Sequence, residues 1–412
     1  MAPQYAPSLR SRLPVVALLL ETIFILFFAF YVEVQHIFSI TFYAEFQDVH
    51  VMVFMGFGFL STFLVRYGFS STGFSLLVAA LAVQWAIVFR VLLQLPYPGR
   101  ITIERLVLAE MSAFSSLISM GVVIGKTNPV QLLLMSLMEV TGFILNEWLI
   151  QTLLKVKLKH IIMYLHIYGA FFGIMTSWTL YRKGIEPRHE KEKSDRKMTL
   201  FSFFGTLFLW IFWPSFNSAY LLNKDMDFAV PLNVICSTYL AMAVSAVTAI
   251  ALSVLFNPRG KLNMRHVQNC ILAGGVAVGG TMSTFPQPWV AMAVGLSAGI
   301  MSTLGHQYIK PLMEIVFKCH DTCSILSVHG LPGILGWFVR LFLQIANFDS
   351  TTIAVRFTVY HILILLITLA SSLTMGVITG IILKWKLWRP PQDRKCFDDQ
   401  AFWKFPHLAK HE

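Results

Sequence analysis

Apolar segments long enough to cross a lipid bilayer recur along almost the whole chain. Of the 412 residues, 56% are hydrophobic and only 13% are charged, whereas a soluble domain carries about a quarter charged residues. A helix that crosses the bilayer core needs about 20 mainly apolar residues. The sequence predicts about twelve such segments, at roughly 14–32, 50–66, 75–95, 107–125, 129–149, 161–181, 199–215, 227–256, 267–284, 287–305, 324–346 and 354–384. Because helices satisfy their own backbone hydrogen bonds in lipid, we expect an all-α integral membrane protein.

The connecting loops are short, so the sequence predicts one transmembrane domain over residues 1–390 and a tail over 391–412. A charged loop from Arg182 to Lys197 divides the chain near its middle. The five predicted segments before this loop (about 48–182) and the five after it (about 199–346) are interpreted as two copies of a repeat. Transporter folds often place their pathway at the interface between such repeats.

The charge distribution predicts the orientation. An even number of spans puts both termini on one side, and most of the 32 Lys and Arg residues fall in loops on that side. By the positive-inside rule, both termini are expected to be cytoplasmic. Lys155, Lys157 and Lys159 run against this bias. No small-residue cleavage site follows the first segment, which is therefore predicted to remain as a span.

The five cysteines predict no disulfide framework. Cys319, His320 and Cys323 could suggest a metal site, but no fourth ligand is evident, so free thiols are favoured. The chain contains no Asn-x-Ser/Thr glycosylation sequon. It also shows no nucleophile–base set and no nucleotide-binding loop, so we expect neither an enzyme nor a cofactor.

Two histidines, His166 and His329, lie inside long apolar segments. An ionisable side chain in a membrane is costly, which makes both candidates for a functional site. Each precedes a glycine by two helical turns, Gly173 and Gly336, for which we expect a packing role. Two facing neutral imidazoles can share a proton and still offer a donor or an acceptor to a small guest. The pair therefore predicts a path for a small neutral hydrogen-bonding molecule, with satisfied core histidines as the alternative.

Other side chains in the spans have weaker interpretations. Glu139 could serve as a proton relay, but a structural carboxyl hydrogen-bonded between helices is favoured. The aromatic run from Trp213 to Phe216 could hold a cation on its ring faces, although an interfacial aromatic belt is the more common meaning. Gly295 and Gly299 are four residues apart and predict close helix packing.

Four sequence motifs carry a resemblance to a known family. They are WPSFNSA (213–219), LAGGVAVG (272–279), HDTCSILSVHGLPG (320–333) and HIYGAFFG (166–173). With these motifs the chain resembles the Rh family, relatives of the ammonium transporters, over essentially its whole length. The tail motif FDDQAFWKFPHL (397–408), with the missing sequon, is most similar to the erythroid non-glycosylated Rh polypeptides of the D/CE type that carry blood-group antigens.

The resemblance implies a trimer in which each subunit has its own pore between two inverted five-span repeats, with an extra N-terminal span. It implies pore histidines at His166 and His329 and an outer gate or vestibule that includes Trp213 and Phe216. The second gate phenylalanine of the family corresponds to Met111 here, and the aspartate of a V-K-D run is replaced by Leu158.

Two functions follow from the resemblance. The first is a plasma-membrane channel for ammonia or ammonium, with carbon dioxide as a further candidate substrate. The histidine pair favours this channel function. The second is a non-conducting erythrocyte subunit that assembles with a glycosylated Rh partner and reaches the membrane skeleton, through an ankyrin-type contact of its tail. Leu158, Met111 and the tail motif favour this second function.

Overall fold

The computed structural model describes residues 9–34, 43–97, 99–155, 161–182, 189–219, 221, 229–279 and 287–405. Within these ranges, 11 helical segments are long and apolar enough to cross a membrane. The predicted all-α membrane architecture is confirmed. Many large apolar side chains remain exposed on the outside of the bundle, as a lipid-facing surface requires.

Eight of the spans are single α-helices. They are α1 (Leu13–Tyr31), α4 (Gly68–Leu92), α5 (Ile103–Val123), α6 (Pro129–Leu154), α7 (Ile161–Thr179), α8 (Arg196–Ala219), α9 (Ala229–Leu255) and α15 (Thr351–Leu383). Three spans are composites of α-helix with π-helical or 3-10 turns. They run through α2 (Tyr43–Val51), η3 (Met52–Gly56), α3 (Phe57–Leu60) and η4 (Ser61–Phe63); through α12 (Pro288–Leu304), η6 (Gly305–Ile309) and α13 (Lys310–Ile315); and through η7 (Leu326–Gly330) and α14 (Leu331–Ala346).

The predicted segment at 267–284 is not one long helix. It is divided into α10 (Met264–Cys270) and α11 (Ala273–Val278), so the twelve expected spans become 11 long helical segments plus this broken pair. Small residues allow the pair to sit deep in the bundle. A Cβ atom on Gly274 would lie 2.4 Å from the carbonyl oxygen of Ala241, and one on Gly275 would lie 2.7 Å from the Trp213 ring. Any larger side chain would push α11 away from α8 and α9.

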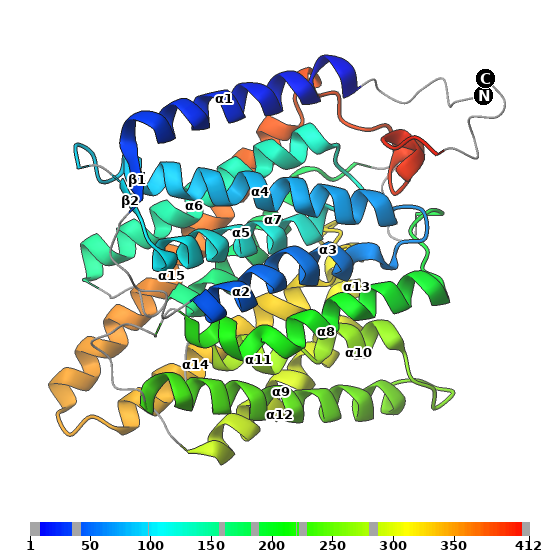
Figure 1. The fold of residues 1–412 in the computed structure, drawn as a ribbon. Helices are drawn as coiled ribbons and strands as arrows, with labels where there is room; N and C mark the ends of the chain where they lie inside the picture. The colour runs from blue at the N-terminus through cyan, green and yellow to red at the C-terminus, as the bar shows by residue number, and fades with distance from the viewer. Residues whose placement is uncertain are drawn as a thin grey trace.

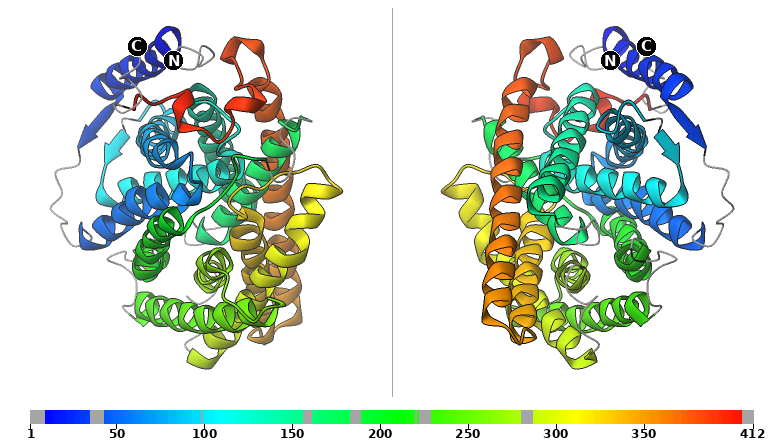
Figure 2. Two further views of the ribbon diagram at one scale, coloured as in Figure 1. Left: turned by 90° about the vertical axis from the view of Figure 1, so that its right-hand side faces the viewer. Right: turned by 90° about the vertical axis from the view of Figure 1, so that its left-hand side faces the viewer.

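The long helices run side by side, as Figure 1 shows; in the turned views of Figure 2 several of them are seen end-on, while α15 runs from top to bottom. α1 lies on the outside of the bundle against α4 and α6. Only 6% of its most apolar 18-residue stretch is buried. After α1, the strand β1 (Val32–Val34) pairs in parallel with β2 (Gly99–Ile101), which lies between α4 and α5. At the other end of α1, the Arg12 guanidinium donates to the Leu387 carbonyl. We call this the tail end of the bundle, and the opposite end the far end.

The described part of the tail packs on the tail end of the bundle. It forms three 3-10 turns, η8 (Lys386–Trp388), η9 (Asp393–Lys395) and η10 (Asp399–Ala401). The Asp399 carboxylate accepts hydrogen bonds from the backbone N–H groups of Phe69 (2.9 Å) and Ser70 (2.7 Å) at the start of α4. A carboxylate there satisfies free donors of the helix and complements its dipole. Phe397 is fully buried, and its N–H donates to the Gly125 carbonyl at 2.8 Å.

Candidate functional site

His166 on α7 and His329 on η7 meet in the interior of the bundle. Their Nδ1 atoms are 3.2 Å apart, and the rings stack at 5.2 Å with an interplanar angle of 20°. Both side chains are fully buried. The expectation that the two imidazoles face one another is therefore met by the geometry.

Close helix packing fixes the two rings in this position. A Cβ atom on Gly173 would lie 2.9 Å from the Ser119 backbone on α5. A Cβ atom on Gly336 would lie 2.3 Å from the Ala277 carbonyl oxygen on α11. Each histidine-bearing helix thus approaches its neighbour through the glycine two turns further on, which supports the packing role predicted for both glycines.

Aromatic side chains enclose the histidine pair. The Trp213 indole stacks near both imidazoles, with ring centroids 5.8 Å from His166 and 6.3 Å from His329. The Phe216 ring stacks on Phe114 at 4.4 Å with an interplanar angle of 25°. The Phe114 ring also meets His166 edge-on at 5.7 Å and His329 at 6.4 Å. Trp213 and Phe216 thus belong to the site and not to an interfacial belt.

The ring that stacks on Phe216 does not come from position 111, where the resemblance placed the second gate residue. The side chain that stacks on Phe216 is Phe114, three residues further along α5, and Met111 is buried without entering this stack. The two positions lie on neighbouring turns of the same helix, so a motif match cannot decide which side chain enters the space. The stack above the histidines has two aromatic rings, and sequence reasoning missed one of them.

Hydrogen bonds hold α8, and with it Trp213 and Phe216, in place. The Asn217 side-chain amide donates to Thr238 on α9 and to the Gly275 carbonyl on α11, both at 3.0 Å. A buried amide with two partners fixes the position of α8 more firmly than apolar packing alone, because leaving a buried amide unpaired is costly. The motif containing Asn217 is thus partly a scaffold for the rings beside it.

The histidine pair presents two different nitrogen atoms to its surroundings. Two neutral imidazoles can share the Nδ1–Nδ1 contact only if one ring donates and the other accepts. The donating ring then has an acceptor Nε2, and the accepting ring has an Nε2–H donor. Neither Nε2 atom of His166 or His329 has a hydrogen-bond partner among the residues that the structure describes. Each Nε2 atom is therefore open to a small hydrogen-bonding guest, one as an acceptor and the other as a donor.

Glu139 lies apart from this pair, in the interface between α6 and α5. Its carboxylate accepts a hydrogen bond from the Ser115 hydroxyl at 2.5 Å, and the side chain is fully buried. This geometry supports the structural role that the sequence favoured for Glu139.

A buried polar cluster at the tail end supports the segment that leads into η7. The Lys126 ammonium donates to the carbonyls of Val122 and His320, each at 2.7 Å, and to the Ser177 hydroxyl at 2.9 Å. The His320 ring meets the Glu192 carboxylate through Nε2 at 3.0 Å. This cluster joins the turn after α5, the helix α7 and the segment before η7. The sequence analysis did not predict it, because its members are far apart in the chain.

Burial dominates the electrostatics of this cluster. It lowers the pKa of Lys126 from 10.5 to about 8, against the opposing effect of nearby acidic groups that include Glu192. It also lowers the pKa of His320, together with the charge of Lys126. Burial alone would raise the pKa of Glu192, but the hydrogen bond and charge of His320 keep it below its usual value. The Lys126 Nζ also lies 3.2 Å from the His320 Nδ1, so the His320 ring links Lys126 to Glu192.

The structure also bears on the candidate metal site at Cys319, His320 and Cys323 and on the segment around Leu158. In the described part of the chain, no group of three or more His, Cys, Asp and Glu residues is arranged to hold a metal ion. Burial raises the pKa values of Cys319 and Cys323 to about 12, so both are protonated free thiols. Leu158, together with Lys157 and Lys159, lies outside the described residues, while Lys155 ends α6 with a left-handed backbone.

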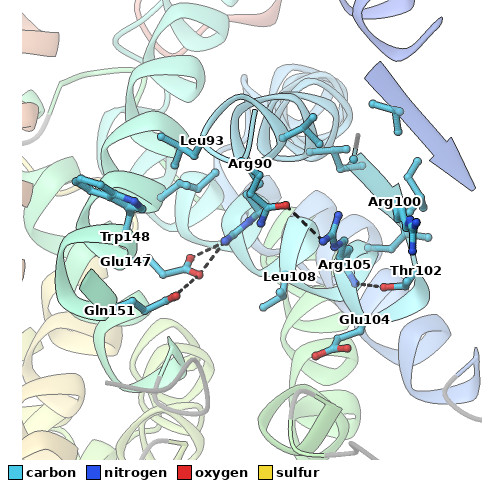
Figure 3. A pocket seen from close by; sticks show the side chains of 18 residues that line it. Arg90, Leu93, Arg100, Thr102, Glu104, Arg105, Leu108, Glu147, Trp148 and Gln151 are labelled. Atoms are coloured by element: carbon cyan, nitrogen blue, oxygen red, sulfur yellow. Dashed lines mark hydrogen bonds and ion pairs between the residues drawn. The ribbon is translucent and has the colours of Figure 1, made fainter. Parts of the chain in front are cut away.

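A cavity of about 560 Å³ opens near the far end between α4, α5 and α6 (Figure 3). The Arg90 guanidinium and the Glu147 carboxylate form a bidentate pair across it, at 2.8 and 2.7 Å. Arg105 and Glu104 also line it, from the first turn of α5. None of the predicted site residues lines this cavity.

The fold and the site define a class of protein: a polytopic helical membrane protein with a buried imidazole pair under an aromatic stack. The chain matches the family model described as "Ammonium Transporter Family" over residues 15–392. It belongs to this family.

Two relatives match almost the whole chain. It is 38% identical to Ammonium transporter Rh type C of Canis lupus familiaris, covering 98% of this chain and 95% of the relative. It is also 38% identical to Ammonium transporter Rh type A of Bos taurus, covering 98% and 97%.

Solved structures show the same fold. The chain resembles the structure described as "Nitrosomonas europaea Rh50 and mechanism of conduction by Rhesus protein family of channels". The TM-score is 0.77, the identity 29%, and the match covers 90% of this chain and 94% of that one. A Sensor Amt Protein resembles it in fold, with a TM-score of 0.68 at 18% identity, covering 90% and 97% of the two chains.

Proposed function

We propose that this protein conducts ammonia across the plasma membrane, with His166 and His329 lining the path. The observation that carries the proposal is the 3.2 Å contact between their Nδ1 atoms, which leaves two buried Nε2 atoms open. Ammonia has three donor hydrogens and one lone pair, so it can pair with both an acceptor and a donor nitrogen. A bare alkali cation would lose its hydration shell here without enough ligands.

The surroundings support a path with its entrance at the far end. The Phe114–Phe216 stack covers the imidazoles, and ring faces attract an ammonium cation by up to about 2 kcal/mol. Ammonium would give up its proton before this stack, and neutral ammonia would continue past the histidines. The same site would exclude Na⁺ and K⁺, which cannot shed a proton.

The arrangement of the chain in the membrane is also a proposal. The bias of Lys and Arg residues supports cytoplasmic termini, which makes the tail end cytoplasmic and the far end external. Packing within the halves supports an internal repeat over about 48–182 and 199–346: α4 packs on α5 and α6, and α9 packs on α11 and α12. We further propose a trimer, following the expectation for the family.

A second candidate function is a non-conducting subunit. The close aromatic packing favours it, because Phe114, Phe216 and Trp213 are all fully buried around the imidazoles. The tail motif at 397–408 supports a likeness to the erythroid polypeptides. Such a subunit would join a glycosylated Rh partner in the erythrocyte membrane and contact the skeleton through its tail.

A flux measurement distinguishes the two candidates. Full-length protein in proteoliposomes is given an ammonium gradient, and the change of internal pH is followed by stopped flow. We expect flux above that of empty liposomes, and its loss in His166→Ala and His329→Ala. His361→Asn is the matched control, because His361 is also buried but stacks on Trp337 at 4.9 Å, away from the pair.

No flux in the wild-type protein would contradict the channel proposal and favour the second candidate. In that case Leu158→Asp tests whether the missing family carboxylate is the reason for the lack of flux. If it is, this substitution would restore ammonium flux. Recovery of the protein with a glycosylated Rh polypeptide from erythrocyte membranes would support the structural role.

A further inference from the structure

A second polar pair lies in the bundle on the far-end side of the aromatic stack. His50 on α2 contacts the Glu110 carboxylate on α5 through its Nδ1 atom and Oε1. The Glu110 side chain is 3% exposed, whereas that of His50 is 48% exposed. The pair therefore joins a buried carboxylate to the outside of the bundle.

Helix geometry places Glu110 next to the aromatic stack. Phe114 follows Glu110 by four residues on α5, so the two side chains share a face about 6 Å apart along the axis. Phe57 follows His50 by seven residues, and its ring meets Phe114 edge-on at 4.7 Å. The helices that carry the pair thus also carry the rings below it, and Glu110 lies one turn outward of Phe114.

One oxygen of the Glu110 carboxylate is open to a hydrogen-bond donor. Its Oε2 atom is buried and has no hydrogen-bond partner within the described ranges of the chain. A buried carboxylate oxygen without a donor is unfavourable, so this position suits a proton or a small N–H donor. Rigid helices place the position directly before the Phe114–Phe216 stack.

A second carboxylate at the same level is connected to the gate. Asp48, two residues before His50 on α2, accepts a hydrogen bond from the Ser215 hydroxyl at 2.7 Å, and Ser215 directly precedes Phe216. Asp48 and Glu110 together give this side of the stack a negative potential. A cation that approaches the stack from the far end meets both carboxylates before it reaches the rings.

We propose that Glu110 is the proton acceptor for ammonium at the far end, with His50 as the residue that positions its carboxylate; this rests on the proposed function. Ammonium binds the open Oε2 atom and transfers a proton to it: one N–H bond breaks, one O–H bond forms, and ammonia plus a neutral carboxyl result. Ammonia moves on past Phe114 and Phe216. The His50 Nδ1–H donates to Oε1 and holds the carboxyl in place, and the carboxyl then releases the proton from Oε2 back to the far-end side.

Proton acceptance by Glu110 also accounts for the missing family carboxylate. Leu158 cannot take a proton, whereas Glu110 supplies an acceptor from another helix. In this chain deprotonation would therefore depend on α5 and α2 and not on the segment that contains Leu158.

The test combines flux with a direct observation of the carboxyl group. Variants Glu110→Gln, Glu110→Asp and His50→Asn are compared with wild type, and Glu139→Gln is the matched control for a buried carboxylate elsewhere. The first measurement is ammonium-driven flux in proteoliposomes. The second is infrared difference spectroscopy at fixed pH, in which ammonium chloride is added to the full-length protein and the protonated-carboxyl band is recorded.

We expect Glu110→Gln to reduce flux by about a hundredfold, the usual scale for loss of an acid–base group. Glu110→Asp should retain part of the flux, His50→Asn should slow it, and Glu139→Gln should resemble wild type. Ammonium should produce a carboxyl band in wild type that is absent from Glu110→Gln. Wild-type flux that is unchanged in Glu110→Gln would overturn the proposal.

The infrared measurement separates this proposal from the channel function. If wild type conducts nothing but shows an ammonium-dependent carboxyl band that Glu110→Gln lacks, the channel proposal fails and the acceptor site stands. If no band depends on Glu110, the acceptor site is refuted whether or not the protein conducts.

Discussion

Replacement of Lys126 by methionine tests whether the polar cluster at the tail end holds the segment before His329. The ammonium of Lys126 makes three hydrogen bonds of 2.7–2.9 Å and also contacts the His320 Nδ1 at 3.2 Å, and Lys126→Met removes all of these interactions. Each hydrogen bond to a charged group contributes about 1.5–3 kcal/mol. Methionine has a similar length but no charge, so it packs in the same space.

The burial of the charge offsets part of this loss. A pKa lowered from 10.5 to about 8 means that burial penalises the charged form by about 3 kcal/mol. Methionine does not pay this penalty. The net effect of Lys126→Met at neutral pH is therefore a destabilisation of about 1.5–6 kcal/mol.

The same shift predicts a dependence on pH. Between about pH 8 and 10.5, the folded state binds fewer protons at Lys126 than the unfolded state does, because its folded pKa is the lower one. Stability from this group therefore rises with pH through that window, by up to about 3 kcal/mol. The difference between the wild-type and Lys126→Met stability curves isolates this contribution from that of the other lysines.

The assay is the thermal unfolding midpoint of full-length protein in lipid nanodiscs, measured from pH 7 to 10.5. Lys126→Met should unfold at a lower temperature and lack the rise specific to Lys126. Ammonium flux should also fall, because the His320–Asp321 segment continues directly into η7 and positions His329. An unchanged midpoint with an unchanged pH profile would refute the assignment of the cluster as a support for η7.

Three further predictions concern the packing around the site. Gly336→Leu should prevent folding, since even a Cβ atom would lie 2.3 Å from the Ala277 carbonyl oxygen; recovery of correctly folded protein by size-exclusion chromatography would contradict it. Glu147→Gln should lower the unfolding midpoint through loss of the bidentate pair with Arg90, at a cost of about 3–5 kcal/mol, and a thermal shift near zero would show that the pair is not structural. Phe114→Ala should lower stability by about 3–5 kcal/mol but raise ammonia flux, because this ring covers both imidazoles; folded protein with unchanged flux would show that Phe114 does not limit passage.

The sequence by itself determined the membrane class, the approximate positions of the spans and the importance of the two histidines. Hydrophobicity is local along the chain, so a run of about 20 apolar residues marks a helix without knowledge of its neighbours. An ionisable residue in such a run can also be recognised from the sequence, because it is energetically costly there and therefore rare. His166, His329, Gly173 and Gly336 could all be singled out in this way.

Only the tertiary structure decided which side chains meet. The break between α10 and α11 depends on the close approach of Ala241 and Trp213, which belong to other helices. Phe114, and not a ring at position 111, stacks on Phe216 because the rotation of α5 places that ring there. Contacts such as the one between His50 and Glu110 join residues 60 positions apart. Spacing along one helix carries no information about its rotation toward the next, and that rotation is set by packing of the whole bundle.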